Sequence, residues 1–183
     1  MRNPGFWLLL GFGVFGCTSD TTPTVYVGTA YQVRCIDCQP RAQDDAVRSI
    51  KAVEGEAGHR LACRIDNESG TKRATFSVVH DSADEAKNYA LELNDANLSE
   101  ESDGPCEVRV VDGANTYKGA CGSDEPTEDR PCQVSVRLEG RVLKGNIYCA
   151  KIPSDATANI TRYVVAPLTR DPAQFEIYGC SGL

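Results

Sequence analysis

CQVSVRLEGRVLKGNIYC, residues 132–149, has the pattern of a β-hairpin. Apolar and polar residues alternate on both sides of Gly140-Arg141, and glycine in the first position favours a two-residue type II′ turn. With this turn, residues whose numbers add up to 281 face each other, so Cys132 lies opposite Cys149. Counting outward from the hydrogen-bonded pair beside the turn makes this a non-hydrogen-bonded pair, in which Cα atoms approach to about 4.5 Å. The segment therefore predicts a disulfide between Cys132 and Cys149, whereas a turn centred on Glu139-Gly140 would place Cys132 opposite Ile147.

The preceding segment repeats this plan in weaker form. Cys106-Glu107-Val108-Arg109-Val110 resembles the start of the first hairpin, and the segment closes at Cys121. Each segment also carries Lys-Gly shortly before its closing part, at Lys118-Gly119 and at Lys144-Gly145. We expect two similar hairpins, with Cys106 and Cys121 joined across a turn near Gly113.

Short alternating runs separated by turn residues continue through the chain from Val25. They predict strands near 25–34, 60–66, 72–80, 88–94, 106–111, 116–121, 132–138, 142–151, 160–166 and 174–180. Ten short strands predict a mainly β fold, either an antiparallel two-sheet β-sandwich or a jelly-roll-like barrel with disulfides.

Two stretches compete with the all-β pattern. Residues 40–53 place Val47, Ile50 and Val53 on one helical side, which predicts a short helix. Ser82-Ala83-Asp84-Glu85 matches a capping box, and the residues after it alternate as in a strand. We expect one helical turn there, followed by a strand.

The remaining cysteines complete a disulfide framework. The chain has nine cysteines, and eight remain when Cys17 is set aside as the end of an apolar leader. An even number behind a secretory leader is typical of disulfide bonding in an oxidising compartment. Cys35 and Cys38 are too close for a relaxed bridge between strand residues, so we expect each to reach either Cys63 or Cys180.

Residues 1–16 have the composition of a signal peptide. A basic start with Arg2 precedes the apolar run Phe6 to Val14-Phe15, and the small residue Gly16 follows. A membrane-spanning helix needs about 20 apolar residues, so this shorter run predicts a cleaved signal rather than an anchor helix.

Val14-Phe15-Gly16-Cys17 resembles the lipobox of bacterial lipoprotein precursors, with Phe15 departing from the small residue usual at that position. The resemblance implies cleavage before Cys17, a diacylglycerol on its sulfur and an acylated amino terminus. Thr18, in place of Asp, implies the outer membrane rather than the inner one. We expect a signal peptide at 1–16, a lipidated Cys17 with a flexible tether at 17–24, and one disulfide-stapled β domain at 25–183.

Motifs that carry catalysis are few. Cys35-Ile36-Asp37-Cys38 has the Cys-x-x-Cys spacing of thiol oxidoreductases, although the βαβ alternation of that fold is missing. The sequence has no Gly-x-Ser-x-Gly, His-Glu-x-x-His or Ser-x-x-Lys motif, and its many carboxylates nominate no pair for hydrolysis. We therefore expect no catalytic residue.

No metal site or cofactor is expected either. His59 and His80 stand far apart in the sequence, so we expect each to be a surface or turn residue rather than a zinc ligand. The acidic stretches 94–103 and 124–129 lack the spacing of a calcium loop and are expected to be solvated.

The net charge and the predicted location of the protein together define the expected function. The net charge of −7, without a basic stripe, excludes nucleic acid as a favoured partner. We expect an envelope-anchored lipoprotein, at the cell surface or in the periplasm, whose non-enzymatic β domain binds an envelope protein or polysaccharide or takes part in a structural assembly. The alternative is a secreted enzyme, either an oxidoreductase using Cys35 and Cys38 or a hydrolase with an unidentified carboxylate site.

Overall fold

A computed structural model of the chain describes residues 23–28, 32–35, 50–68, 70–98, 106–153, 161–165 and 173–183. This part of the chain is mostly strand and has almost no helix, as the alternating pattern predicted. The strands are β1 (Val25–Gly28), β2 (Gln32–Cys35), β3 (Ile50–Val53), β4 (His59–Glu68), β5 (Thr71–His80), β6 (Tyr89–Asn97), β7 (Glu107–Asp112), β8 (Asn115–Gly122), β9 (Cys132–Glu139), β10 (Val142–Pro153), β11 (Thr161–Val165) and β12 (Ala173–Tyr178).

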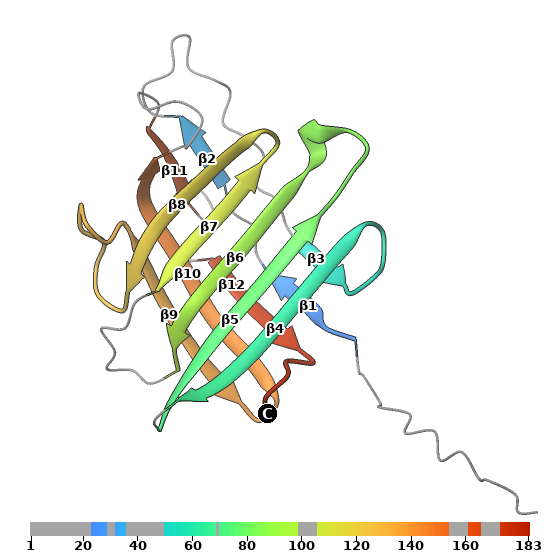
Figure 1. Cartoon of the computed structure of the whole chain (residues 1–183). Coiled ribbons are helices and arrows are strands. Elements are labelled where there is room, and N and C mark those ends of the chain that lie inside the picture. The colour runs from blue at the N-terminus through green and yellow to red at the C-terminus, as the bar shows by residue number, and fades with distance from the viewer. Residues whose placement is uncertain are drawn as a thin grey trace, which may run out of the picture.

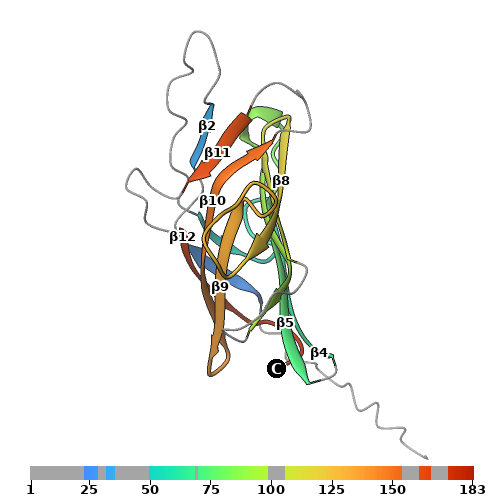
Figure 2. The same cartoon turned by 90° about the vertical axis from the view of Figure 1, so that its left-hand side faces the viewer.

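Ten of these strands form a nearly closed barrel in the order β3-β1-β12-β10-β9-β8-β7-β6-β5-β4. Figure 1 shows β4 to β8 in front and β9, β10, β12 and β1 behind them, and Figure 2 shows the same two layers edge-on. The barrel is therefore flattened, which reconciles the two architectures that the strand pattern predicted. β11 pairs with the far part of β10, and β2 pairs with β11 outside the barrel path.

One strand pair departs from the antiparallel rule. β8 and β9 run parallel and share only two residue pairs, Cys121 with Cys132 and Gly122 with Gln133. The loop from 123 to 131 joins them, and β9 then continues in the same direction beyond the end of β8. This short parallel contact joins the two layers of the barrel.

The two hairpins with predicted disulfides have the predicted register. Cys132 lies directly opposite Cys149, with Cα atoms 4.0 Å apart, and the two sulfurs are bonded. Gly140 has a φ of 62°, the left-handed value that a type II′ turn requires at its first position. Cys106 and Cys121 are also bonded, across the hairpin that turns at Gly113. Both predictions are confirmed.

The third disulfide corrects the prediction for the remaining cysteines. Cys63 is bonded to Cys180, so neither is the partner of Cys35 or Cys38. Cys35 ends β2, while Cys38 lies outside the described residues. The bond forms because the chain after β12 crosses to β4, where Ser181 exchanges backbone hydrogen bonds with Cys63 and Ile65. The C-terminal segment thereby covers the free edge of β4 and helps to close the barrel.

The predicted helix near 40–53 is wrong at its C-terminal end, and 40–49 lie outside the described residues. Residues 50–53 form β3, which pairs with β1 along its whole length. Pairing with a neighbouring strand outweighs a weak helical period in so short a stretch. The expected helical turn after Ser82 is confirmed as a 3-10 turn at Glu85–Lys87, followed directly by β6.

Apolar side chains from both layers fill the barrel. The largest fully buried ones include Tyr26, Phe76, Leu93, Leu143, Ile152 and Ile177. Gly145 faces this core, where an added Cβ would lie 2.5 Å from the Ser135 carbonyl oxygen and 2.7 Å from the Phe175 ring. Glycine at this position therefore lets β9, β10 and β12 pack closely around Phe175.

Candidate functional site

The cysteines of the two hairpins lie in the barrel wall, where they form disulfides that cross-link neighbouring strands. Cys132 and Cys149 are 1% and 0% exposed, and Cys121 lies beside Cys132 on the parallel strand. Two disulfides therefore sit side by side across β7, β8, β9 and β10. Because buried disulfides of this kind offer no thiolate, we assign them a structural role. Cys17 lies outside the described residues, so its lipidation stays a prediction.

A polar hollow lies on the outer wall of β9, β10, β12 and β1. Its volume is about 530 Å³, and Gly28, Gly145 and Phe175 are among the residues that line it. Donor side chains (Arg137 and Lys144), an acceptor (Glu176) and two amides that can do both (Asn146 and Gln174) line it. Asn146 and Gln174 are directly opposite on β10 and β12, so the wall presents two adjacent amides.

A chain of ion pairs holds the side chains at one side of this hollow. Arg137 Nε lies 2.7 Å from Glu139 Oε1, and Lys144 Nζ lies 3.0 Å from Glu139 Oε2 and 3.1 Å from Glu176 Oε1. The Tyr178 hydroxyl donates to Glu176 Oε2. Cations and carboxylates alternate along this chain, so they largely neutralise each other.

These contacts shift the titration of the linked groups. Hydrogen bonds from Arg137 and Lys144 lower the pKa of Glu139, and those from Tyr178 and Lys144 lower the pKa of Glu176. The pKa of Lys144 is raised by its bonds to Glu139 and Glu176. Glu139 and Glu176 are therefore ionised and Lys144 is protonated at neutral pH, which favours fixed side-chain positions.

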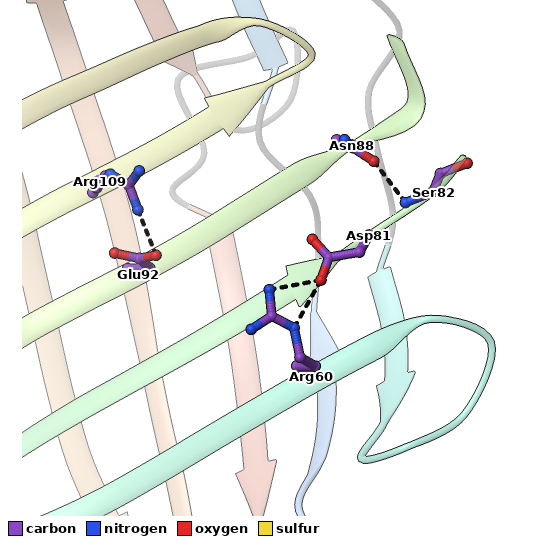
Figure 3. Close-up of polar contacts among 6 residues, drawn as sticks. All are labelled: Arg60, Asp81, Ser82, Asn88, Glu92 and Arg109. Atoms are coloured by element: carbon purple, nitrogen blue, oxygen red, sulfur yellow. Dashed lines mark hydrogen bonds and ion pairs between the residues drawn. The ribbon is translucent and has the colours of Figure 1, made fainter. Parts of the chain in front are cut away.

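The opposite outer wall, on β4 to β7, carries isolated pairs instead of a chain. Figure 3 shows Arg60 paired with Asp81 and Arg109 paired with Glu92. A second hollow of about 680 Å³ lies on this wall and includes small side chains such as Ala62 and Ser77. The ion pairs Arg60–Asp81 and Arg109–Glu92 on this wall are not linked to each other, unlike the chain from Arg137 to Glu176.

At one end of strands β4 to β6, the side chains that face the barrel interior are histidine and tyrosine instead of apolar residues. His59, His80 and Tyr89 are cross-strand partners on β4, β5 and β6, and their residue positions point into the barrel. The two imidazole centroids are 4.9 Å apart, and the His80 ring stacks on the Tyr89 ring at 5.1 Å. His59 Nε2 lies 2.8 Å from the Tyr89 hydroxyl. The structure thus brings together the two histidines of the chain, which were expected to stand apart as surface or turn residues.

Loop carbonyls hold both imidazoles. Nδ1 of His59 lies 2.9 Å from the Glu56 carbonyl oxygen, and Nδ1 of His80 lies 3.3 Å from the Lys87 carbonyl oxygen. The loop that carries Lys87 is itself fixed, because Asn88 Oδ1 accepts from the Ser82 amide at 2.6 Å (Figure 3). This end of the barrel is therefore ordered by its own loops.

Tyr26 of β1 is a buried neighbour of this end. Its side chain is completely buried, and its hydroxyl has no hydrogen-bond partner among the described residues. Burial raises the pKa of Tyr26 far above its ordinary value, and nearby Tyr89 raises it further. The hydroxyl is therefore neutral at all physiological pH values.

Sequence reasoning missed the histidine pair, although the signal was present. Residues 66–70 read as a turn, and a two-residue turn that places Glu68 opposite Thr71 pairs residues whose numbers add up to 139. His59 and His80 satisfy that sum. The hollow had no comparable signal, because its lining joins β10 to β12, which are distant in the sequence.

Within the described ranges, no group of three or more His, Cys, Asp or Glu side chains is placed to hold a metal ion. No helix of that same part of the chain has the length and apolar character needed to cross a membrane. Comparison with family models, curated proteins and solved structures finds no match.

Proposed function

We propose that the protein is a lipid-anchored envelope protein whose barrel binds a polysaccharide without catalysing a reaction. The observation that carries the proposal is the outer-wall hollow, where Asn146 and Gln174 stand beside a fixed chain of ion pairs. Sugar hydroxyls both donate and accept hydrogen bonds, and amide side chains match both roles.

Charge balance supports a polysaccharide over a strongly charged partner. Arg137 and Lys144 are already paired with Glu139 and Glu176, so the wall has little net charge of its own. Three disulfides in the barrel keep the wall rigid, which lowers the ordering cost of binding. The lipobox-like Val14-Phe15-Gly16-Cys17 supports placement of this wall at the envelope, with the outer membrane favoured by Thr18.

The binding proposal is tested by co-sedimentation of the purified mature protein with peptidoglycan sacculi and, separately, with extracted outer-envelope polysaccharide. The double variant Asn146→Ala, Gln174→Ala should weaken binding at least tenfold. Its matched control is Ser77→Ala, Asn94→Ala, which alters two polar residues at the hollow on the opposite wall. Absence of wild-type binding to both materials, or equal loss in the control, would overturn the proposal.

The anchor is tested separately by mass spectrometry of protein extracted from membranes. We expect loss of residues 1–16 and added mass from acyl chains on Cys17, both abolished by Cys17→Ser. An unmodified Cys17 in the wild-type protein would contradict the proposed lipid anchor and the location that it implies.

A second candidate function rests on the Cys63 to Cys180 bond. This bond removes both partners that were expected for Cys35 and Cys38, which favours a bond within Cys35-Ile36-Asp37-Cys38 and hence thiol oxidoreductase activity. Reduction of insulin disulfides by the protein with dithiothreitol as reductant, lost in Cys35→Ser, would support this candidate. Turnover equal to that of dithiothreitol alone would exclude it.

A further inference from the structure

We propose that His59 and His80 together bind a divalent transition-metal ion of the Cu²⁺, Ni²⁺ and Zn²⁺ class. The two residues are directly opposite on β4 and β5, and their imidazole centroids are 4.9 Å apart. The site is distinct from the outer-wall hollow, because these residues face the barrel interior.

The hydrogen bonds at Nδ1 define the proton positions on both rings. A carbonyl oxygen can only accept, so Nδ1 of His59 donates to Glu56 O and Nδ1 of His80 donates to Lys87 O. Each neutral imidazole then keeps a lone pair on Nε2, the atom that would ligate a metal. Metal-binding histidines in proteins typically make this same bond from the second ring nitrogen to a carbonyl or carboxylate.

The ring spacing suits one shared ion. With metal to nitrogen distances of about 2.0 to 2.1 Å, the ion lies about 3.2 Å from each ring centre. Two rings bound at angles of about 90° to 110° then have centroids about 4.5 to 5.2 Å apart. The observed 4.9 Å lies inside this interval. Without metal, the Tyr89 hydroxyl donates to His59 Nε2 and occupies its lone pair.

The surrounding loops fix the pair before any ion arrives. The Asp81 amide donates to the Gly58 carbonyl at 3.0 Å, which ties the β3–β4 turn to the end of β5. The Gly113 amide donates to the Asn88 carbonyl, which ties the β5–β6 loop to the β7–β8 turn. Anchored ligands lose little freedom on binding, so the two rings need little further ordering once the Tyr89 hydroxyl leaves His59 Nε2.

The ligand set determines the class of ion. Imidazole nitrogen suits copper, nickel and zinc, whereas calcium and magnesium prefer oxygen ligands. Two protein nitrogens leave coordination positions for water or an external ligand, so the affinity should be lower than at a site with three or four protein ligands. Among the three ions, Cu²⁺ should bind most tightly.

The test uses the mature protein without a histidine tag, after alkylation of its free thiols. Titration calorimetry with CuCl₂ should show one site per chain, and MgCl₂ should show none. Because His59 and His80 are the only histidines of the chain, imidazole nitrogen couplings in the Cu²⁺ electron paramagnetic resonance spectrum report on this pair alone.

The variants His59→Gln and His80→Gln should each lower the Cu²⁺ affinity at least tenfold. Tyr89→Phe is the matched control: it keeps the ring that stacks on His80 and frees His59 Nε2, so binding should persist or tighten. Circular dichroism establishes that each variant is folded, and the wild-type spectrum provides a readout that needs no variant. A wild-type Cu²⁺ spectrum without coupling to two imidazoles would overturn the proposal. Unchanged Cu²⁺ affinity in a folded variant that carries both His59→Gln and His80→Gln would also overturn it.

Discussion

The β9–β10 and β4–β5 hairpins share one plan and differ in the chemistry that it brings together. Both have two-residue turns with a left-handed glycine, Gly140 and Gly70. Counted from the turn, Cys132 and Cys149 form the eighth pair and the histidines form the tenth. In both hairpins an even count gives a non-hydrogen-bonded pair, where side chains approach most closely.

The difference lies in where each pair stands in the barrel. The cysteine pair is buried where the two layers meet, and its two facing sulfurs form a covalent cross-link. The histidine pair is half-buried at a barrel end, where loop carbonyls orient both rings. The same backbone geometry thus places a disulfide between Cys132 and Cys149 in the buried wall of the barrel. In the other hairpin it places the side chains of His59 and His80, with their nitrogen lone pairs, near the loops.

Removal of the cysteine pair should give the largest effect. Cys132→Ala with Cys149→Ala should lower the free energy of unfolding by about 3 kcal/mol, because the unfolded chain is no longer restricted by the loop. The matched change in the other hairpin, His59→Gln with His80→Gln, should cost less than about 1 kcal/mol. Urea denaturation measures both. Equal losses of unfolding free energy in the two variants would contradict our distinction between a structural cysteine pair and a binding histidine pair.

Hairpin register explains what the sequence could predict. Cys132 with Cys149 and Cys106 with Cys121 follow from turn position alone, because both pairs lie within local hairpins. The histidine pair follows from the same rule applied at Gly70, so it was predictable. Cys63 with Cys180 was not, because their contact joins segments 117 residues apart and depends on barrel closure.

A second prediction compares equivalent inward positions of the two hairpins. The fourth residue after the turn is Gly145 in β10 and the fully buried Ala74 in β5. Gly145→Ala should cost about 2 kcal/mol, because the new Cβ would meet the Ser135 carbonyl and the Phe175 ring, and such overpacking strains a core. Ala74→Gly should cost about 1 kcal/mol from lost packing and added chain entropy. Thermal unfolding of both variants gives the comparison, and a Gly145→Ala variant as stable as wild type would contradict it.

The β4–β5 hairpin can also be given a disulfide like that of the β9–β10 hairpin. His59→Cys with His80→Cys should form a disulfide spontaneously, because a non-hydrogen-bonded pair has suitable Cα spacing. The net gain in unfolding free energy should be about 1 kcal/mol, since lost contacts with Tyr89 offset part of the loop-closure effect. Titration under denaturing conditions should find no more free thiols than in the wild type. Two extra free thiols would show that the paired positions are farther apart than in the β9–β10 hairpin.

The smallest effect should come from the ion pairs on the outer wall of β9 and β10. Hydrogen bonds from Arg137 and Lys144 lower the pKa of Glu139 below its ordinary value of 4.5, and those from Tyr178 and Lys144 do the same for Glu176. A carboxyl whose pKa is lower in the folded state stabilises the fold above its unfolded pKa. This stabilisation disappears as the pH falls through the folded pKa, so the affected window lies below pH 4.5.

Lys144→Met should therefore flatten the acid side of the pH dependence of stability, with little change at neutral pH because exposed ion pairs contribute little. The pKa of Lys144 is itself raised, so its contribution is present below its ordinary value of 10.5 and is lost only at higher pH. Lys51→Met removes the same charge from β3 and controls for net charge. Urea midpoints measured from pH 3 to 7 should show a shallower acid decline in Lys144→Met than in wild type or Lys51→Met. Parallel curves for all three proteins would mean that the network on this hairpin fixes side-chain positions without contributing to acid stability.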